Sequence, residues 1–224
     1  MIGGCAVVVM TKAPLVGYAK TRLIPALGAA GAAALAERMI EHAVDQACDA
    51  ALGPVWLVGA PDIGHPLFER LAATRGVRVS PQGDGDLGAR MSRALELALA
   101  TCRRALLIGA DAPAIVAPTL RRAAALLDDH DAVFIPALDG GYVAVGLRRP
   151  APGLFSGMVW STARVMRDTR ERLRLAGLRH AELAPVADID LPGDLTHLPP
   201  SWPESGSVQI RDGAPDMAFR QTTE

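Results

Sequence analysis

Short apolar runs alternate along the chain with segments in which apolar residues recur every three or four positions. Short apolar runs predict buried strands, and the wider spacing predicts helices with one face on a core. The predicted strands span 6–10, 55–58, 77–80, 105–108 and 132–136, and the predicted helices span 28–52, 66–75, 86–102, 118–127 and 161–176. This alternation favours an α/β fold with a largely parallel sheet.

Two local signals refine this pattern in the second half of the chain. The segment from Asp139 to Tyr142 contains two glycines, which predicts a tight turn and an antiparallel return strand over 142–147. Ser161 stands before the last predicted helix and is predicted to be its N-cap. The sheet is therefore expected to be mixed, although most of its strands are expected to be parallel.

The regular pattern ends near residue 198, and no interior linker divides the chain before that point. We therefore expect one domain over 1–198. From Pro199 onward the sequence is rich in proline and serine, with a weakly apolar stretch at 208–210. Residues 199–224 are predicted to form an extended C-terminal tail that adds an edge strand or remains mobile.

Composition excludes several partners. The 224 residues carry a formal net charge of −1, which gives no basic surface for a nucleic acid. The cysteines are widely spaced within apolar runs, which is typical of core residues in a reducing cytoplasm: Cys5, Cys48 and Cys102. No apolar stretch reaches the roughly 18 residues of a membrane span, so no membrane partner and a cytoplasmic location are predicted.

The loop after the first predicted strand carries three cations, Lys12, Lys20 and Arg22, together with Gly17 and Thr21. A loop at the carboxyl end of a strand is where open α/β sheets hold phosphorylated ligands. Glycine permits the turn, and the threonine hydroxyl can contact a phosphate oxygen. The loop therefore predicts a diphosphate or triphosphate site, whereas the alternative is that these cations are simply solvated.

A glycine-rich segment at 83–91 leads into the third predicted helix. It follows Gln82 and contains Gly88 and Arg90. The first backbone amides of a helix are free to bind an anion or a polar ring. These residues are therefore candidates for contacts with a nucleobase or a phosphate. Glycine-rich helix entries are common, so the segment indicates a binding site only when it is taken together with Gln82 and the cationic loop.

Acidic residues supply a candidate metal site. Asp111 follows a buried strand, and Asp188 and Asp190 alternate so that an extended segment sends both carboxylates to one side. Adjacent like charges are costly unless a cation separates them, and Mg²⁺ or Mn²⁺ prefers such oxygen ligands. The alternatives are that Asp111 caps the next helix or turn, and that Asp188, Asp190 or Asp194 caps a short helix that starts near Pro192.

Together these segments resemble a bacterial family of uncharacterised GT-A-fold transferases that are described as glycosyltransferase-like. The genes of this family occur next to radical-SAM genes, and some of them are linked to arsenosugar biosynthesis. A more distant resemblance is to guanylyltransferases that activate phospholactate or phosphoenolpyruvate for deazaflavin cofactor assembly. The resemblance covers about residues 5–198. It rests on residues 12–23, 85–91, 108–113, 136–142, 160–162 and 188–195.

The resemblance implies a three-layer GT-A-like, or nucleotide-diphospho-sugar transferase, fold with a nucleotide bound in the N-terminal half. The sequence departs from these relatives at the fourth predicted strand. Only Asp111 stands there, between two alanines, in place of an Asp-x-Asp pair. A metal ion would therefore need Asp188 or Asp190 as well.

Two reactions fit these residues. A glycosyltransferase breaks the bond between sugar and phosphate in an NDP-sugar, whereas a nucleotidyltransferase attacks the α-phosphorus of an NTP. In both, Lys20 and Arg22 would stabilise the developing negative charge, and Asp139 is the third catalytic candidate. The predicted sugar or acceptor site is Asp139, Gly140, Gly141 and Tyr142. The expected partners are a nucleotide-activated small-molecule donor and a small-molecule acceptor, and a nucleotide-binding protein without catalysis is the third possibility.

Overall fold

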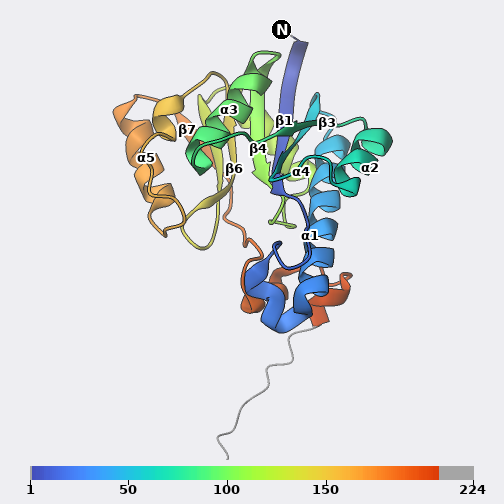
Figure 1. The fold of residues 1–224 in the computed structure, drawn as a ribbon. Coiled ribbons are helices and arrows are strands. Elements are labelled where there is room, and N and C mark those ends of the chain that lie inside the picture. Colours follow the sequence, from blue (N-terminus) through green and yellow to red (C-terminus); the bar gives the residue numbers. More distant parts are fainter. Residues whose placement is uncertain (1, 207–224) are drawn as a thin grey trace, which may run out of the picture.

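The computed structural model describes residues 2–206, which form one seven-stranded sheet with helices on both faces (Figure 1). The strands are β1 (Ile2–Lys12), β2 (Val55–Ala60), β3 (Arg78–Pro81), β4 (Cys102–Gly109), β5 (Ala132–Pro136), β6 (Tyr142–Leu147) and β7 (His180–Glu182). The helices are α1 (Ile24–Asp49), α2 (Pro66–Arg75), α3 (Leu87–Leu99), α4 (Ala117–Leu126) and α5 (Val165–Leu175). The 3-10 helices are η1 (Thr21–Leu23), η2 (Pro152–Leu154), η3 (Pro192–His197) and η4 (Pro203–Gly206).

The sheet is mixed, and its strand order is β3-β2-β1-β4-β6-β5-β7. Strands β3, β2, β1 and β4 run parallel, and β6 pairs antiparallel with both β4 and β5. The predicted α/β class, the mostly parallel sheet and the antiparallel return strand are therefore confirmed. From the carboxyl end of β1 the chain runs to β2, and from the carboxyl end of the neighbouring β4 it runs to β5, so these two connections leave in opposite directions along the sheet.

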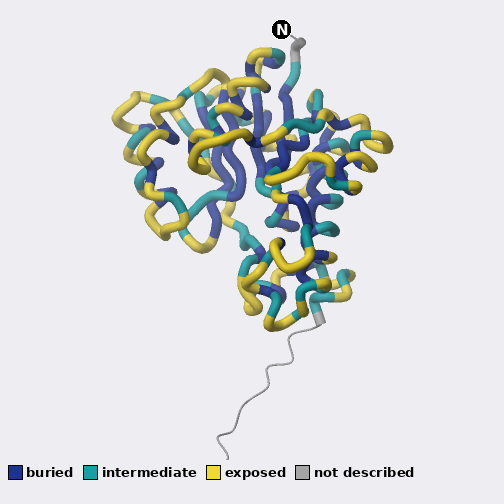
Figure 2. Tube along the Cα trace, viewed as in Figure 1, coloured by how far each residue is buried: buried dark blue, intermediate teal, exposed yellow. Residues whose placement is uncertain are grey.

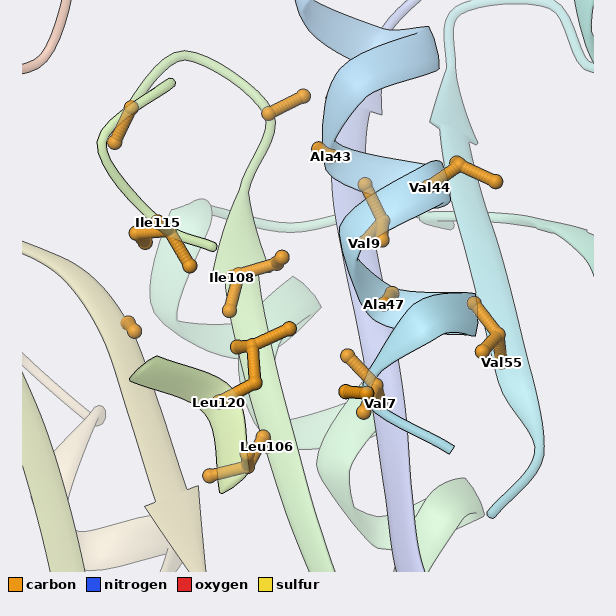
Figure 3. Close-up of a cluster of buried hydrophobic side chains, with 14 of the residues drawn as sticks. Val7, Val9, Ala43, Val44, Ala47, Val55, Leu106, Ile108, Ile115 and Leu120 are labelled. Carbon is orange, nitrogen blue, oxygen red and sulfur yellow. The ribbon is translucent and has the colours of Figure 1, made fainter. Parts of the chain in front are cut away.

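Helices cover the sheet in three layers. Val7 and Val9 of β1 face one side, where they pack with residues of α1, α2 and α4, and Val8 faces the other, where α3 and α5 pack. This division follows from the period of two in a strand, which sends successive side chains to opposite faces. Figure 3 shows Ala43 and Ala47 of α1 near these valines, and Figure 2 shows the buried strands between exposed outer surfaces.

A third, smaller core joins segments that are far apart in the sequence. Leu23 of η1 and Leu35 of α1 pack with Ile189, Leu195 and Leu198 from the end of the described chain. In Figure 1 the first turns of α1 and the red C-terminal segment lie together below the sheet. This cluster fixes residues 188–198 against α1 and so determines where the carboxylates of that segment lie.

Residues 199–206 pack against α1. The Trp202 ring contacts the His42 ring edge-on at a centroid distance of 5.6 Å, and the Arg38 guanidinium lies over Trp202 at 5.8 Å. The rest of the predicted tail, including the weakly apolar stretch at 208–210, lies outside the described residues. The domain boundary at residue 198 stays a prediction.

Three element predictions were wrong in detail. Helix α5 begins at Val165, because Ser161 has a left-handed φ of 60° and the Val165 amide donates to the carbonyl of Thr162. Ser161 is therefore not the N-cap. The third predicted helix, over 86–102, ends early at Leu99, since Cys102 already belongs to β4. Strand β7 was missed because its three residues contain no apolar run.

One apolar segment, Thr21–Asp49, is long enough and apolar enough to cross a membrane by composition, with a mean hydropathy of 1.4. The core helix of a globular protein satisfies the same criterion. Leu35, Ile40 and Val44 of this segment are buried against the rest of the protein. The segment is therefore weak ground for a membrane span, and the cytoplasmic location stays a prediction.

Candidate functional site

A cleft of about 840 Å³ opens at the carboxyl ends of β1 and β4. Segments following β1, β3 and β4 line it, together with the turn between β5 and β6 and residues 160–162 and 188–190. Ligand pockets for small molecules commonly have volumes of roughly 300–1,000 Å³. The cleft lies between the ends of β1 and β4, where the connections to β2 and β5 leave in opposite directions along the sheet. Open α/β sheets usually bind their ligands at such a point.

Most of the predicted site residues meet in this cleft. Its lining includes Lys12, Lys20, Thr21, Arg22, Gln82, Arg90, Asp111, Asp139, Gly141, Tyr142, Asp188 and Asp190. Gly17, Gly88 and Gly140 do not line it. Gly17 and Gly140 have left-handed φ values of 83° and 95°, and Gly88 lies beneath the ring of Trp160. These glycines therefore shape the walls.

Lys20 is the central cation of the cleft. Its Nζ lies 2.7 Å from Asp190 Oδ1 and 3.4 Å from Asp111 Oδ2, and 15% of its side chain is exposed. Burial alone would lower the pKa of Lys20, but the charges of Asp111 and Asp190 outweigh it and raise the pKa. Its backbone is left-handed, with φ 47° and ψ 47°, a conformation that is uncommon for residues with a side chain and is found at binding sites.

Backbone contacts hold the two carboxylates on either side of Lys20. The Ile189 amide donates to the Asp111 carbonyl at 2.9 Å, and the Ile189 side chain is buried. Asp188 and Asp190 on either side of Ile189 therefore both line the cleft, as their alternation predicted. Asp194 Oδ2 accepts from the amides of Asp190 and Leu191 at 3.0 and 2.6 Å, so Asp194 caps this turn.

Asp188 lies in a crowded acidic environment. Burial and the nearby charge of Asp139, followed by those of Asp111 and Asp190, raise the pKa of Asp188 to about 6. Carboxylate oxygens suit Mg²⁺ or Mn²⁺ chemically. Across residues 2–206, however, no three acidic, histidine or cysteine side chains are grouped closely enough to hold a metal ion. The Lys20 ammonium takes the place between Asp111 and Asp190.

Gln82 and Arg90 belong to a wall that is held together by its own hydrogen bonds. Gln82 Nε2 donates to the Thr11 carbonyl at 2.7 Å, and Arg90 Nε donates to the Gly85 carbonyl at 2.9 Å. Arg93, which the sequence did not indicate, donates to the carbonyls of Gln82 and Asp84 at 2.6 and 2.9 Å. These bonds fix the glycine-rich loop at the entrance of α3.

Aromatic side chains form the opposite wall. The rings of Tyr142 and Trp160 meet edge-on at a centroid distance of 6.3 Å, and both residues line the cleft. Tyr142 Oη and Trp160 Nε1 are buried without a hydrogen-bond partner, and burial raises the pKa of Tyr142. Helix α5 begins only at Val165, so Trp160 does not stand directly before a helix, and its ring packs against the hydrophobic core instead.

The fold and the polar cleft define an α/β protein of the nucleotide-diphospho-sugar transferase type. The chain is similar to a Desulfovibrio desulfuricans G20 protein provisionally described as a nucleotide-diphospho-sugar transferase, with 28% identity and a TM-score of 0.77. The similarity covers 84% of this chain and 83% of that one. Residues 43–162 match the family model of uncharacterized proteins conserved in bacteria, DUF2064, and the chain belongs to this family.

More distant structures share the fold alone. One is 4-diphosphocytidyl-2C-methyl-D-erythritol synthase from Anaerococcus prevotii DSM 20548, with 8% identity, a TM-score of 0.58 and coverage of 85% of this chain and 94% of that one. Another is a nucleotidyl transferase from Methanothermobacter thermautotrophicus, with 16% identity, a TM-score of 0.54 and the same coverage. No curated protein matches the chain. The predicted resemblance to an uncharacterised bacterial family with this fold is confirmed.

Proposed function

We propose that this protein is a transferase that uses a nucleotide-activated donor, and that the donor is an NDP-sugar. The observation that carries the proposal is the gathering of Lys12, Lys20 and Arg22 with Asp111 and Asp190 in one nucleotide-sized cleft at the strand ends. The similarity to the Desulfovibrio protein, whose description concerns nucleotide-diphospho-sugars, supports the choice of glycosyl transfer.

The cations would act on the phosphate side of the donor. In glycosyl transfer the bond between the anomeric carbon and the diphosphate oxygen breaks, and the diphosphate leaves with the bonding electrons. Lys20 and Arg22 would stabilise that charge, because positioned cations lower the energy of a transition state in which negative charge develops. Lys12 and Thr21 would contact the remaining phosphate oxygens, and Gln82 and Arg90 would lie at the nucleoside end.

Asp139 would serve the acceptor. Its Oδ1 accepts from the Gly141 amide at 2.8 Å, which orients the carboxylate at the cleft. In the proposed reaction the acceptor hydroxyl or thiol attacks the anomeric carbon, and its proton passes to Asp139 as general base. Tyr142 and Trp160 would flank the sugar, because an aromatic wall with polar edges suits a ring that carries hydroxyl groups.

We propose Mg²⁺ or Mn²⁺ as the cofactor, held by Asp111 with Asp188 and Asp190. The chemistry of the donor set suits such an ion, because all three side chains line the cleft and offer carboxylate oxygens. Within residues 2–206 the three are not grouped closely enough to hold an ion together, so they would have to draw closer to one another. When bound, such an ion neutralises phosphate charge as a Lewis acid. Binding would require the Lys20 ammonium to leave the position between Asp111 and Asp190.

Nucleotidyl transfer is the second candidate. A substrate phosphate or carboxylate would attack the α-phosphorus of an NTP, and pyrophosphate would leave. The observation that favours it is that residues 12–22 alone bring three cations into the cleft, which matches the charge of a triphosphate better than that of an NDP-sugar. A third reading, nucleotide binding without catalysis, would be removed by measured turnover with either donor.

Thermal-shift measurements would test the proposal. The wild-type protein is heated with UDP, GDP, ADP or CMP, with their sugar conjugates and with the NTPs, each with and without Mg²⁺. A ligand that binds the native state raises the unfolding temperature by mass action. We expect one NDP and its sugar conjugate to stabilise the protein. A shift mainly with one NTP would favour nucleotidyl transfer, and no shift with any ligand would contradict the proposal.

Two arginine variants test whether the stabilisation by the nucleoside diphosphate arises from binding in the cleft. Arg22→Ala should remove most of the stabilisation by the nucleoside diphosphate, because Arg22 lines the cleft. Arg103→Ala is the matched control, since Arg103 is exposed near the start of β4, at the end of that strand opposite the cleft. Equal losses in both variants would mean that general charge, and not this cleft, binds the nucleotide.

A further inference from the structure

Lys20 forms ion pairs that are unusual for a phosphate-binding lysine, because its ammonium contacts two carboxylates of the protein itself. Its ammonium donates to two carboxylates that come from separate segments, Asp111 after β4 and Asp190 before η3. A phosphate-binding cation normally points its charge at the ligand. Here the charge is directed at the acidic residues, and the burial of the lysine side chain strengthens that interaction relative to a surface pair.

Like charges explain why a cation lies at this position. Asp111, Asp188 and Asp190 all line the same cleft, and Asp111 and Asp190 lie on either side of the Lys20 ammonium. Without Lys20, carboxylates on both sides of the gap would repel each other. The ammonium therefore balances, at these carboxylate oxygens, the same negative charge that a divalent cation would balance.

We propose that Lys20 is a resident cation that competes with the divalent metal ion for Asp111 and Asp190. This inference rests on the proposed function, because it concerns the metal ion of that same site. Metal binding displaces the ammonium, and the donor phosphates then provide its new partner. Metal ion and nucleotide therefore bind with positive coupling, and the metal ion alone binds weakly.

Lys12 supplies a close control. Lys12 and Lys20 are the only lysines in the chain, and both line the cleft. In the part of the chain that the structure describes, Lys20 forms ion pairs with carboxylates and Lys12 forms none. A general effect of positive charge would act through both lysines, whereas competition for the carboxylates would act through Lys20 alone.

The test measures Mn²⁺ binding without nucleotide, from the electron paramagnetic resonance signal of the free ion. We expect Lys20→Met to bind Mn²⁺ about tenfold more tightly than wild type or more, because a charge in direct contact with two ligands has been removed. Lys12→Met should bind Mn²⁺ about as wild type does. Adding Asp111→Asn to Lys20→Met should abolish the gain, which would show that it acts through this carboxylate.

A second variant guards against misfolding. Lys20→Gly removes the ammonium and suits the left-handed backbone at this position, so it should fold even if Lys20→Met does not. If both variants bind Mn²⁺ no more tightly than wild type, the inference is overturned while the proposed function stands. If no variant binds Mn²⁺, the inference and the proposed metal dependence both fail, but nucleotide-dependent thermal shifts would still support the nucleotide site.

Discussion

Different interactions hold the two walls of the cleft together. Ion pairs hold the wall at the ends of β1 and β4, called the charged wall, and close packing holds the wall at β6 and residues 160–162, called the packed wall. On the wall formed by the ends of β1 and β4, Lys20 and its carboxylates satisfy one another at 2.7 and 3.4 Å. On the wall formed by β6 and residues 160–162, Tyr142 Oη and Trp160 Nε1 are buried without partners. The charges of the first wall are paired with one another, whereas the second wall has buried polar groups that packing alone does not satisfy.

This difference indicates which part of a ligand each wall would bind. An ion-paired wall exchanges partners when a charged ligand enters, so it suits phosphates and metal ions. An aromatic wall held by close packing distinguishes ligands by shape and by one or two hydrogen bonds. Substitutions on the first wall should therefore change the chemistry, and substitutions on the second should change stability or the choice of sugar or acceptor.

The largest expected effect is on the charged wall. Asp111→Asn removes the carboxylate charge and keeps nearly the same shape, and we expect transfer activity to fall by about 10²–10³-fold. The dependence of nucleotide affinity on Mg²⁺ should disappear in the same variant. Steady-state kinetics and binding measured with and without Mg²⁺ would show both effects.

Asp194→Asn is the control for that prediction. Asp194 accepts from the backbone amides of Asp190 and Leu191 through Oδ2 alone, and the single side-chain carbonyl oxygen of asparagine can accept both bonds. Its activity should stay within a few-fold of wild type. If Asp194→Asn lost as much activity as Asp111→Asn, the charged wall would be a structural unit and its assignment to metal binding would be contradicted.

A smaller effect is expected on the packed wall. A Cβ atom on Gly140 would lie 2.3 Å from the Ala163 carbonyl oxygen, and the φ of Gly140 is 95°. Gly140→Ala should therefore destabilise the protein by about 2–4 kcal/mol, measured by urea unfolding. Gly153→Ala, where no atom lies within 4 Å and φ is not positive, should cost about 0.5 kcal/mol or less. Similar losses at the two positions would contradict this packing argument.

The smallest effect concerns the unpartnered indole. Trp160→Phe removes the N–H group and keeps an aromatic ring, so the KM for the sugar donor or acceptor should rise about threefold to tenfold while stability changes little. Trp56→Phe is the matched control, because Trp56 Nε1 is also buried without a partner but does not line the cleft. If both variants left KM unchanged, the Trp160 donor would have no role in recognition.

The charged wall was predictable from the sequence for a physical reason. Lys20, Asp111 and Asp190 each follow or flank an apolar run, and the carboxyl ends of parallel strands lie at one edge of a sheet. Alternation around Ile189 also predicted that Asp188 and Asp190 would share a side. The bond between Ile189 and the Asp111 carbonyl, which holds the two segments together, has no sequence signal because any residue can supply it.

The packed wall was less predictable. Ser161 resembles an N-cap in sequence, but its left-handed backbone depends on contacts between residues 140 and 163–166. The role of Trp160 follows from that displaced helix start and from its contact with Gly88, which is 72 positions earlier. Tertiary packing of this kind overrides local propensity, so residue types alone did not reveal it.

The 170 positions that separate Lys20 from Asp190 also bear on how the protein is made. A nascent chain emerges from the ribosome N-terminus first, so the parallel strands and their helices can begin to fold while the acidic partner of Lys20 is still unsynthesised. The cleft acquires its charge balance only when residues 188–190 reach the Asp111 carbonyl and α1. The site is therefore assembled only after the strands of the sheet and α1 have been synthesised, and a chain arrested before residue 188 would carry the cations of the cleft without two of their carboxylates.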